Sequence, residues 1–507
     1  MDRAYTSITN VPTDPLETSP AHYITSARHN RVQGDELFEL ASTLLTASAD
    51  LNKFLTKSGH HQPSFSTPAP SIELTSANAP YFDARSTIIE AAEQIIRLVR
   101  GPRDTLVTLS FEHCATASLQ VAIKYKFASH IPLEGTTTYA AISESVGQSG
   151  VTPALVERII QHTASFGLFD ARPGGVVAHN AMSSLLVTDP DLEAWMYLSA
   201  TIAYPAGASV PKAIEQYGYS MESDEAAYGV SLGRKISQFQ RFREADGHEL
   251  HAMFARAMRG IAAGGAYDWR HAVDGGYPWH LLEEGGGHLV VDVGGGPGHV
   301  AIGLAQKYPK LRFEVQDLPE TVAVGAKSCP DHLKPRISYS PHNFFEPQPK
   351  HTVAEGEGIA YFCRFIMHDW SDKYARNILQ QLASGLRPQD RIIINDVVVP
   401  EPGQEPRERE RRMHDRDLLM LMNLNGRERT LSAFEELCSA VTPKLRVRQV
   451  HQPEQGELSL IEMTLDGIQW ETANHNGLVN HVTTNGVNGH ASNGVNGHAS
   501  NGVNGHA

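Results

Sequence analysis

The sequence predicts an α/β fold in two unlike parts, a mostly helical N-terminal half followed by a domain built on a parallel sheet. Two observations carry this prediction. Up to about residue 270, apolar residues recur at the spacing of amphipathic helices. From residue 289 onward, short apolar strand patterns alternate with helical ones, which is typical of a parallel sheet covered by helices. A chain of 507 residues is long enough for two or three domains.

Composition argues against several classes of partner. The net charge is −14, from 43 basic and 57 acidic residues, which suits neither nucleic acid nor an anionic membrane. The N-terminus lacks a signal-peptide core, and no run is apolar enough to span a bilayer. Four cysteines lie far apart without a C-x-x-C pair, so we expect no disulfide framework and no zinc site: Cys114, Cys329, Cys363 and Cys438. We therefore expect a soluble, cytoplasmic protein without nucleic-acid or membrane partners.

The N-terminal half divides at composition changes. Residues 1–30 are polar and contain three prolines, so we expect them to be disordered. A helical domain is predicted over 31–270, with a linker rich in Ser and Pro at 57–80. Apolar stripes over 81–130, interrupted at Gly101-Pro102, are usually core, and without a nearby sheet they could also form a dimer interface.

A winged-helix pattern is predicted between residues 136 and 187. Thr138 precedes a short helix, and Thr152-Pro153 begins a second one. Two short strands then flank the turn Pro173-Gly174-Gly175. DNA binding would require a basic second helix, but this helix offers only Arg158 and His162 against Glu157. A structural or dimerising role therefore fits better.

The stretch 289–301 (LVVDVGGGPGHVA) reads as a buried strand, a glycine turn and the start of a helix. Glycines let the main chain approach a ligand closely, and the free N–H groups of a helix start favour a polar or anionic group. We therefore expect a nucleotide-like cofactor here. The frame Gly296-x-Gly298-x-x-Ala301 also fits the dinucleotide fingerprint, and a glycine turn without a ligand stays open as an alternative.

Further strands are expected after this one, with a helix at 373–386. In such a sheet ligands bind at the carboxyl ends of the strands, so polar residues that follow strands are candidate site residues. The five predicted strands are 289–293, 311–316, 359–363, 391–399 and 458–465.

Two strand ends offer residues suited to a nucleoside. Asp317 ends the second strand, nineteen residues after Gly298, and a carboxylate there can accept both ribose hydroxyls. Capping the following helix is the alternative role for Asp317. Asn343 and Phe344 follow the third unit and could hold the edge and the face of an adenine ring.

Two other strand ends offer a general base. His368 follows the strand 359–363, and histidine is the usual base near neutral pH. A lone His is more often structural, but this position strengthens the case for a base. Asp396 interrupts the strand 391–399, where a carboxylate is costly unless paired, and Glu428 adds a second acid. One His with two acids to orient it forms a candidate base constellation.

These motifs, in this order, resemble the S-adenosylmethionine-dependent O-methyltransferases of the caffeate and flavonoid type, most closely their fungal relatives from secondary-metabolite pathways. The resemblance covers roughly residues 30–470 and joins five motifs that are individually loose. They are Asp292-x-Gly-Gly-Gly-x-Gly, Val315-Gln316-Asp317-Leu318-Pro319, His368-Asp369-Trp370, Asp396 and Gly426-Arg427-Glu428-Arg429-Thr430.

The resemblance implies a Rossmann-like methyltransferase catalytic domain over 271–470, preceded by a helical dimerisation domain with a winged-helix element. It implies S-adenosylmethionine as the cofactor and a homodimer as the assembly. The implied roles are Gly294, Gly295 and Gly296 at the methionine part, Asp317 at ribose, Asn343 and Phe344 at adenine, Arg364 beside the cofactor, and His368 as base flanked by Asp396 and Glu428. The family usually has Asp at position 343, and its plant members have Lys at 364 and Glu at 396.

The implied chemistry is methyl transfer to a phenolic or enolic hydroxyl of a small aromatic, polyketide-type metabolite. A sulfonium methyl is already activated, so no metal is required, and the protein has to align the hydroxyl and remove its proton. A phenol of pKa ~10 is ionised to about one part in a thousand at neutral pH. A histidine of pKa ~6.5 is largely neutral there and can take the proton.

Two other functions stay open at this point. A cyclase or pericyclase that binds S-adenosylmethionine on the same scaffold would not need His368 as a base. A dinucleotide-dependent oxidoreductase is favoured by the glycine fingerprint alone. The C-terminal tail 471–507 ends in the repeat NGVNGHAS over residues 485–507, and we expect this tail to be disordered and dispensable.

Overall fold

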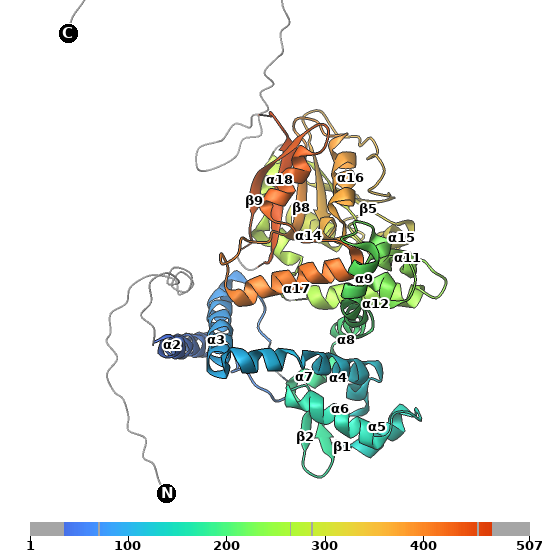
Figure 1. Cartoon of the computed structure of the whole chain (residues 1–507). Coiled ribbons are helices and arrows are strands. Elements are labelled where there is room, and N and C mark those ends of the chain that lie inside the picture. The colour runs from blue at the N-terminus through green and yellow to red at the C-terminus, as the bar shows by residue number, and fades with distance from the viewer. Residues whose placement is uncertain (1–34, 69–70, 264, 285–286, 454–455, 469–507) are drawn as a thin grey trace, which may run out of the picture.

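The computed structural model describes residues 35–68, 71–263, 265–284, 287–453 and 456–468. The N-terminal segment 1–30 and the repeat tail 471–507, both expected to be disordered, lie outside the described residues. The described chain forms a helical N-terminal part and a C-terminal α/β part (Figure 1). The predicted fold class, an α/β domain with a mostly parallel central sheet after a helical region, is confirmed.

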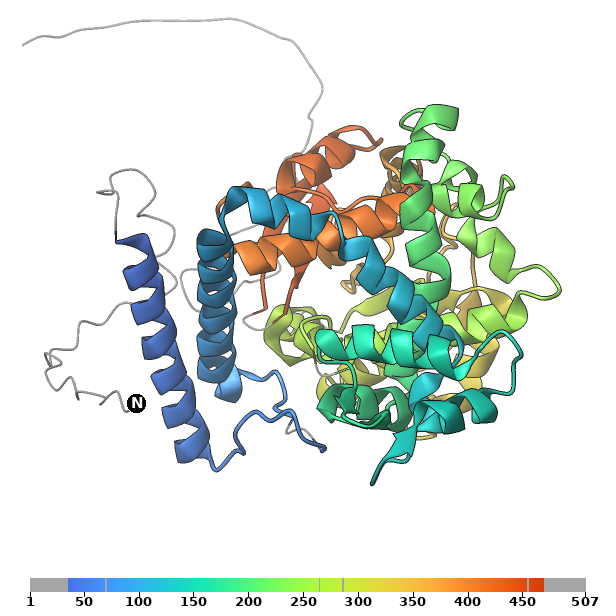
Figure 2. The same cartoon turned by 60° about the horizontal axis from the view of Figure 1, so that its bottom comes forward.

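Three long helices begin the helical part: α2 (Glu36–Ser58), α3 (Ala79–Leu109) and α4 (Glu112–Lys124). The interruption predicted at Gly101-Pro102 is present, because Gly101 has a φ of 74° and breaks the helical path within α3. Helix α2 packs along α3 at the outer edge of the molecule (Figure 2). Within the described ranges no single helix is long and apolar enough to cross a membrane, although the bent pair 76–109 and 112–124 passes that test when taken together.

The region 136–187 contains the predicted sequence of two helices and a hairpin. Thr138 and Thr152 cap the two helices by accepting hydrogen bonds from Ala141 N and Leu155 N. The two hairpin strands join a short first strand in a sheet of order β1-β3-β2. The elements are β1 (Thr137–Thr138), α5 (Tyr139–Val146), α6 (Pro153–Ser165), β2 (Asp170–Arg172) and β3 (Val176–Ala178).

Seven more helices lead to the sheet, and an ion-pair cluster ties two of them together. Asp191 on α8 pairs with Arg256 and Arg259 on α12, at 3.3 and 3.0 Å. The helices are α7 (Ala181–Thr188), α8 (Pro190–Leu198), α9 (Tyr204–Tyr217), α10 (Ala227–Ser231), α11 (Gln238–Phe242), α12 (His248–Ala262) and α13 (Trp279–Glu284).

The central sheet has seven strands in the order β6-β5-β4-β7-β8-β10-β9. Strands β4 to β8 are parallel, but β10 runs antiparallel to both β8 and β9, unlike the wholly parallel sheet expected. The edge strands β6 and β9 were not predicted, because each buries few side chains and so lacks a continuous apolar run. The strands are β4 (Leu289–Val293), β5 (Arg312–Asp317), β6 (Ile337–Pro341), β7 (Ile359–Arg364), β8 (Arg391–Val397), β9 (Leu445–His451) and β10 (Leu458–Leu465).

Both faces of the sheet are covered, which explains why its central strands read as unbroken apolar runs. Val290 and Val291 are adjacent on β4 and both fully buried, one in the core on each face. The helices of this part are α14 (His299–Lys307), α15 (Pro319–Ser328), α16 (Asp372–Ala383), α17 (Arg407–Leu424) and α18 (Leu431–Ser439).

Strand order determines where a ligand can bind. The chain passes from β4 outward through β5 to β6, then returns to place β7 on the other side of β4. Ligands of such sheets bind at this reversal, outside the carboxyl ends of the strands.

Helix α17 lies across the junction of the two parts and extends from α3 towards α9 (Figure 1). Its N-terminus is held by the buried Glu90 of α3, which accepts a hydrogen bond from Glu408 N at 3.0 Å.

Candidate active site

The glycine loop after β4 needs glycine at several positions. Gly294, Gly296 and Gly298 have φ values of 69°, 58° and 85°, a left-handed conformation that other residues adopt at a cost. A Cβ on Gly294 would lie 2.4 Å from the Ile366 side chain, and one on Gly295 would lie 2.5 Å from the Asp292 carboxyl carbon. The loop is therefore packed tightly against Ile366 and Asp292 at these two glycines, whereas a Cβ on Gly296 would meet nothing within 4 Å.

Asp317 ends β5 directly beside this loop. Its Oδ2 accepts a hydrogen bond from Gly296 N at 2.9 Å, and its Oδ1 accepts one from Leu318 N at 2.7 Å. Burial raises the pKa of Asp317 although these two N–H groups oppose the rise. Each carboxylate oxygen has a second lone pair, so Asp317 can still accept hydrogen bonds from a ribose.

Asp292 is a site residue that the sequence offered only as part of a motif. It is buried in β4, and its Oδ2 has no hydrogen-bond partner among the described residues. Burial, with a contribution from Asp317, raises its pKa to about 7. A buried carboxyl oxygen without a partner is costly. Together with the glycine loop and Asp317, it fits a ligand that brings hydrogen-bond donors, as S-adenosylmethionine does.

The two residues predicted at adenine are placed differently. Phe344 lies against the loop, 3.9 Å from where a Cβ of Gly294 would be, and meets Trp370 edge to face. Asn343 is exposed, and its side chain is bonded within its own turn to Phe345 N and Glu346. The geometry thus brings Phe344 to the loop and uses the Asn343 amide for a local turn.

Arg364 is the last residue of β7, next to the glycine strand. Its guanidinium donates to Asn395 Oδ1 and to the carbonyl of Tyr267, both at 2.5 Å. Burial lowers its pKa to about 10, and the positive charge in turn opposes the rise in the pKa of Asp292. Arg364 therefore supplies positive charge near the loop and fixes the segment around Tyr267.

His368 lies in a one-turn 3₁₀ helix, Met367–Asp369, directly after β7. Its Nδ1 donates to Glu428 Oε1 at 2.8 Å, and its ring stacks on Phe365 at 5.2 Å. Asp369 Oδ1 lies 3.4 Å from Nε2. Asp396 accepts a hydrogen bond from the main-chain N of His368 rather than from the ring, at 3.2 Å. The structure thus brings the three predicted residues together and adds Asp369.

The protonation of this cluster differs from the ordinary histidine behaviour expected from the sequence. Burial alone would lower the pKa of His368, but Glu428 and Asp369 outweigh burial and raise it to about 9. Burial raises the pKa of Asp369 to about 6 and also raises that of Asp396. Burial would do the same to Glu428, but His368 holds the pKa of Glu428 below its usual value. Both shifts favour an imidazolium paired with a carboxylate.

Arg429 holds the turn that carries His368, a role the sequence did not reveal. Its side chain is 1% exposed and donates to the carbonyls of Met367 and Trp370 and to Asp372 Oδ1, at 2.7, 2.6 and 2.9 Å. Arg427 N donates to the carbonyl of His368 at 3.0 Å. The segments that contain His368 and Glu428 are thus joined by several hydrogen bonds.

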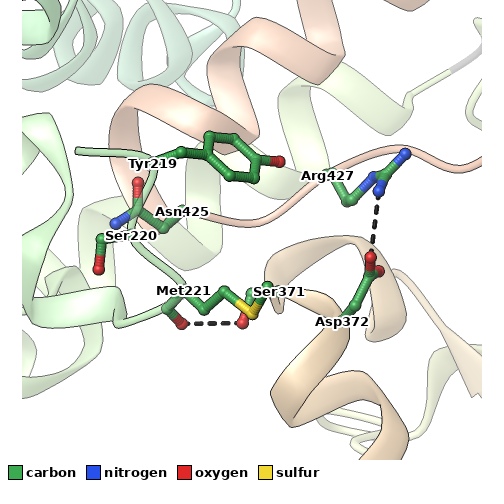
Figure 3. A pocket seen from close by; sticks show the side chains of 7 residues that line it. All are labelled: Tyr219, Ser220, Met221, Ser371, Asp372, Asn425 and Arg427. Atoms are coloured by element: carbon green, nitrogen blue, oxygen red, sulfur yellow. Dashed lines mark hydrogen bonds and ion pairs between the residues drawn. The ribbon is translucent and has the colours of Figure 1, made fainter. Parts of the chain in front are cut away.

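A shallow pocket lies beside this turn, where the helical part meets the α/β part (Figure 3). It has room for about one water molecule. Ser371 donates to the carbonyl of Met221 at 2.8 Å on one side, and Arg427 pairs with Asp372 at 3.1 Å on the other. Its lining is Tyr219, Ser220, Met221, Ser371, Asp372, Asn425 and Arg427. No group of three or more His, Cys, Asp or Glu in the described part of the chain could hold a metal ion.

Comparisons with known proteins agree with this geometry. The family model for an O-methyltransferase domain matches residues 285–442. The chain is 71% identical to O-methyltransferase CTB2 of Cercospora beticola over 462 residues, which cover 91% of this chain and 100% of the relative. It is 60% identical to O-methyltransferase elcB of Phaeosphaeria nodorum over 388 residues, 76% of this chain and 88% of the relative. The chain therefore belongs to the O-methyltransferase family.

Solved structures share the fold. The crystal structure of OxaC with sinefungin and meleagrin matches with a TM-score of 0.63 at 19% identity, covering 84% of this chain and 99% of that one. A structure described as a pericyclic reaction enzyme matches with a TM-score of 0.62 at 21% identity, covering 84% and 100%. At these identities both show the fold alone. With its fungal relatives, the protein is an S-adenosylmethionine-dependent O-methyltransferase that acts on a small metabolite.

Gly426 allows a test of how closely the two fastened segments must approach. A Cβ at this position would lie 2.3 Å from the carbonyl oxygen of His368 and 2.7 Å from the main chain of Asp369. Gly426→Ala should displace the His368 turn, lower kcat at least tenfold, and destabilise the protein by about 1–3 kcal/mol. Steady-state kinetics and urea unfolding measure both effects.

The matched control is Gly385→Ala, where a Cβ would meet only the Tyr361 hydroxyl, at 4.0 Å. This variant should keep the wild-type kcat. A Gly426→Ala protein with unchanged kcat and stability would show that the close approach is not required.

Proposed function

We propose that His368 is the general base of this O-methyltransferase and that the substrate hydroxyl is phenolic or enolic, on a small aromatic metabolite of polyketide type. The observation that carries the proposal is the buried pair between His368 Nδ1 and Glu428 Oε1, at 2.8 Å. This pair stands at the carboxyl end of β7, the strand beside the glycine strand β4. Cofactor and base therefore adjoin the same crevice.

In this proposal the cofactor residues act by position and charge. Asp317 accepts the ribose hydroxyls, the main chain of Gly294, Gly295 and Gly296 faces the methionine part, and Phe344 covers the adenine side. Asp292 supports this assignment, because its unpartnered buried oxygen needs a donor. When bound, S-adenosylmethionine supplies a methyl group already activated for transfer, so the remaining task of the chain is to orient and deprotonate the hydroxyl.

The raised pKa of His368 suits a weakly acidic hydroxyl. Moving a proton from a phenol of pKa ~10 to an ordinary histidine of pKa ~6.5 is unfavourable by about 5 kcal/mol, whereas moving it to a group of pKa about 9 costs only about 1.4 kcal/mol. The drawback is that few molecules contain the neutral base, since at pH 7 about one imidazole in a hundred is neutral. Glu428 holds the Nδ1 proton, so the substrate proton goes to Nε2, which Asp369 Oδ1 approaches to 3.4 Å.

The same pair disfavours the pericyclase alternative. A pericyclic rearrangement moves no proton to a base, so a buried His with its acid would have no task in it. The Asp369 carboxyl at Nε2 adds a second acceptor for a hydroxyl proton beside the base. The pair therefore supports methyl transfer as the reaction, and rearrangement would appear as an isomer of the substrate without label.

Asp317 is the residue to test for cofactor binding. Asp317→Ala removes the acceptor from the end of β5 and should weaken S-adenosylmethionine binding at least tenfold, because two hydrogen bonds to an ionised carboxylate are lost. Isothermal titration calorimetry measures the affinity, with circular dichroism to confirm folding. Unchanged affinity in a folded variant would remove Asp317 from the site, and a response to NAD alone would contradict the cofactor assignment.

His368 is the residue to test for chemistry. His368→Gln should lower kcat by about 10²–10⁴-fold, the usual size of general-base catalysis, and leave S-adenosylmethionine affinity nearly intact. Because folding raises the pKa of His368, the neutral base accumulates only as pH rises, so kcat/KM of the wild type should climb up to about pH 9. The variant should lose this rise of kcat/KM with pH, and its rate should recover only as the solvent ionises the phenol.

Labelled S-adenosylmethionine with a panel of phenolic polyketides gives these rates. Wild-type kcat in the variant would show that another group is the base. An isomer of the substrate without label transfer would instead support the rearrangement.

We further propose that the helical part, residues 31–270, is a dimerisation domain that pairs with a second copy of the chain. Helix α2 has 23 residues but buries only Ala47 and Leu55. Exposed large hydrophobic side chains continue along α3 to the residue before α4, and together they leave an apolar surface on the helical part. Helix α2 and the first half of α3 stand at the edge of the molecule (Figure 2). Members of this surface are Phe38, Leu45, Val99, Leu106 and Phe111.

Charge placed on this surface tests the dimer. The wild-type chain should be a dimer at micromolar concentration by light scattering, and Val99→Glu combined with Leu106→Glu should make it monomeric. Val324→Glu on α15, equally exposed but in the catalytic part, is the control. A chain ending near residue 470 should remain dimeric and folded, and a monomeric wild type would contradict the proposal.

We propose the cytoplasm as the place of action. All four cysteines are free, and Cys329, Cys363 and Cys438 are buried as thiols, the state that a reducing compartment maintains. A tagged chain found by microscopy in an oxidising compartment would contradict this assignment.

A further inference from the structure

Glu428 has a second cationic neighbour besides His368. Its Oε1 lies 2.8 Å from His368 Nδ1 and also 3.3 Å from Arg416 Nε on α17. The Glu428 side chain is 0% exposed and that of Arg416 is 12% exposed. Charges this deeply placed are weakly screened by solvent, so the two cations compete for one carboxylate oxygen.

Aromatic rings keep Arg416 in place. Its guanidinium lies over the ring of Tyr267, 3.9 Å from the centroid, and over Phe365 at 4.8 Å. Phe365 is the ring on which His368 itself stacks, with 20° between the planes. The Nη1 atom of Arg416 is buried and has no hydrogen-bond partner among the described residues. The cation is therefore held beside the base by stacking and by Glu428.

We propose that Arg416 is a positioning residue for methyl transfer, which fixes the Glu428 carboxylate and limits how tightly His368 holds its proton. The inference rests on the proposed role of His368 as the base. Arg416 acts through Glu428, so it changes the properties of the base without itself touching the reacting hydroxyl.

The charges around His368 act on its pKa in opposite directions. Burial disfavours the imidazolium, but three carboxyls from separate segments favour it and raise the pKa of His368. Arg416 is a cation whose Nε lies 3.3 Å from Glu428 Oε1, so its positive charge repels the imidazolium. The same charge lowers the pKa of Glu428 and Asp369, which keeps both carboxyls ionised. The charged groups that face the cluster are Glu428 and Arg429 after α17, Asp369 on the turn of His368, Asp396 from β8, Arg364 from β7, and Arg416 and Asp417 from α17.

The sign of the effect follows directly. Without the Arg416 charge, no cation on α17 would repel the imidazolium. The proton would be held more tightly, and the neutral base would form only at higher pH. A charge at this distance in a partly buried site shifts a titration by on the order of one pH unit.

The test is the pH profile of kcat/KM, which reports the groups of the free enzyme. In Arg416→Gln and in Arg416→Met the acid limb should move about one pH unit upward, and kcat/KM at pH 7 should fall about tenfold. Arg416→Lys keeps the charge and should leave the limb within about 0.3 pH unit of wild type. Arg411→Gln, whose side chain is 70% exposed on the same helix, is the control and should leave the profile unchanged.

The outcomes separate this inference from its alternatives. If the acid limb of the kcat/KM profile does not move in folded Arg416→Gln or Arg416→Met, the inference is overturned. A higher KM as the only change would then mean that Arg416 binds substrate. If both neutral variants unfold, Arg416→Lys decides, because a shift of one unit in a variant that keeps the charge would also overturn it. The proposed function fails separately, through wild-type activity in His368→Gln.

Discussion

The hydrogen bond between His368 Nδ1 and Glu428 Oε1 is the interaction on which the rest of the site depends. It joins two segments sixty residues apart in a place where both side chains are almost completely buried. A buried charge left without its partner costs several kcal/mol, so the fold must hold both segments in register. Asp417 does this for Glu428 by accepting a bond from its main-chain N at 2.9 Å, and Arg429 does it for the turn of His368.

Helix α17 connects this pair to the rest of the molecule. Its C-terminal half contributes Arg416 and Asp417, both in contact with Glu428, and its first turn is bound by Glu90 of α3. The helical part thus does more than extend the surface of the chain. It fixes the direction of the helix that places the acid of the candidate base, so a disturbance in α3 can reach the catalytic part through α17.

The sequence predicted those parts of the site that strand topology places. Gly294, Asp317 and His368 each follow a strand, and parallel strands bring their carboxyl ends to one edge, so their proximity could be inferred without coordinates. The edge strands β6 and β9 could not, because partly exposed strands carry a weak apolar pattern. The strand β10 was predicted, but its antiparallel direction was not, because a buried apolar run looks the same in either direction. Arg416 was hidden for a related reason. The run Arg407–Asp417 is densely charged and is typical of a solvated helix face, while only packing shows which charge turns inward.

Protonation was the least predictable property, since it depends on which atoms of distant segments meet. Asp396 was expected beside the imidazole but binds the main chain of His368, whereas Asp369, next to it in sequence, reaches Nε2. Those choices turn an ordinary histidine into one with a pKa of about 9. Higher basicity favours taking a proton from a phenol, and lower occupancy of the neutral form opposes it. Three carboxyls raise the basicity of His368, and the nearby charge of Arg416 limits that rise, so the site lies between a strong base that is rarely neutral and a weak base that is mostly neutral.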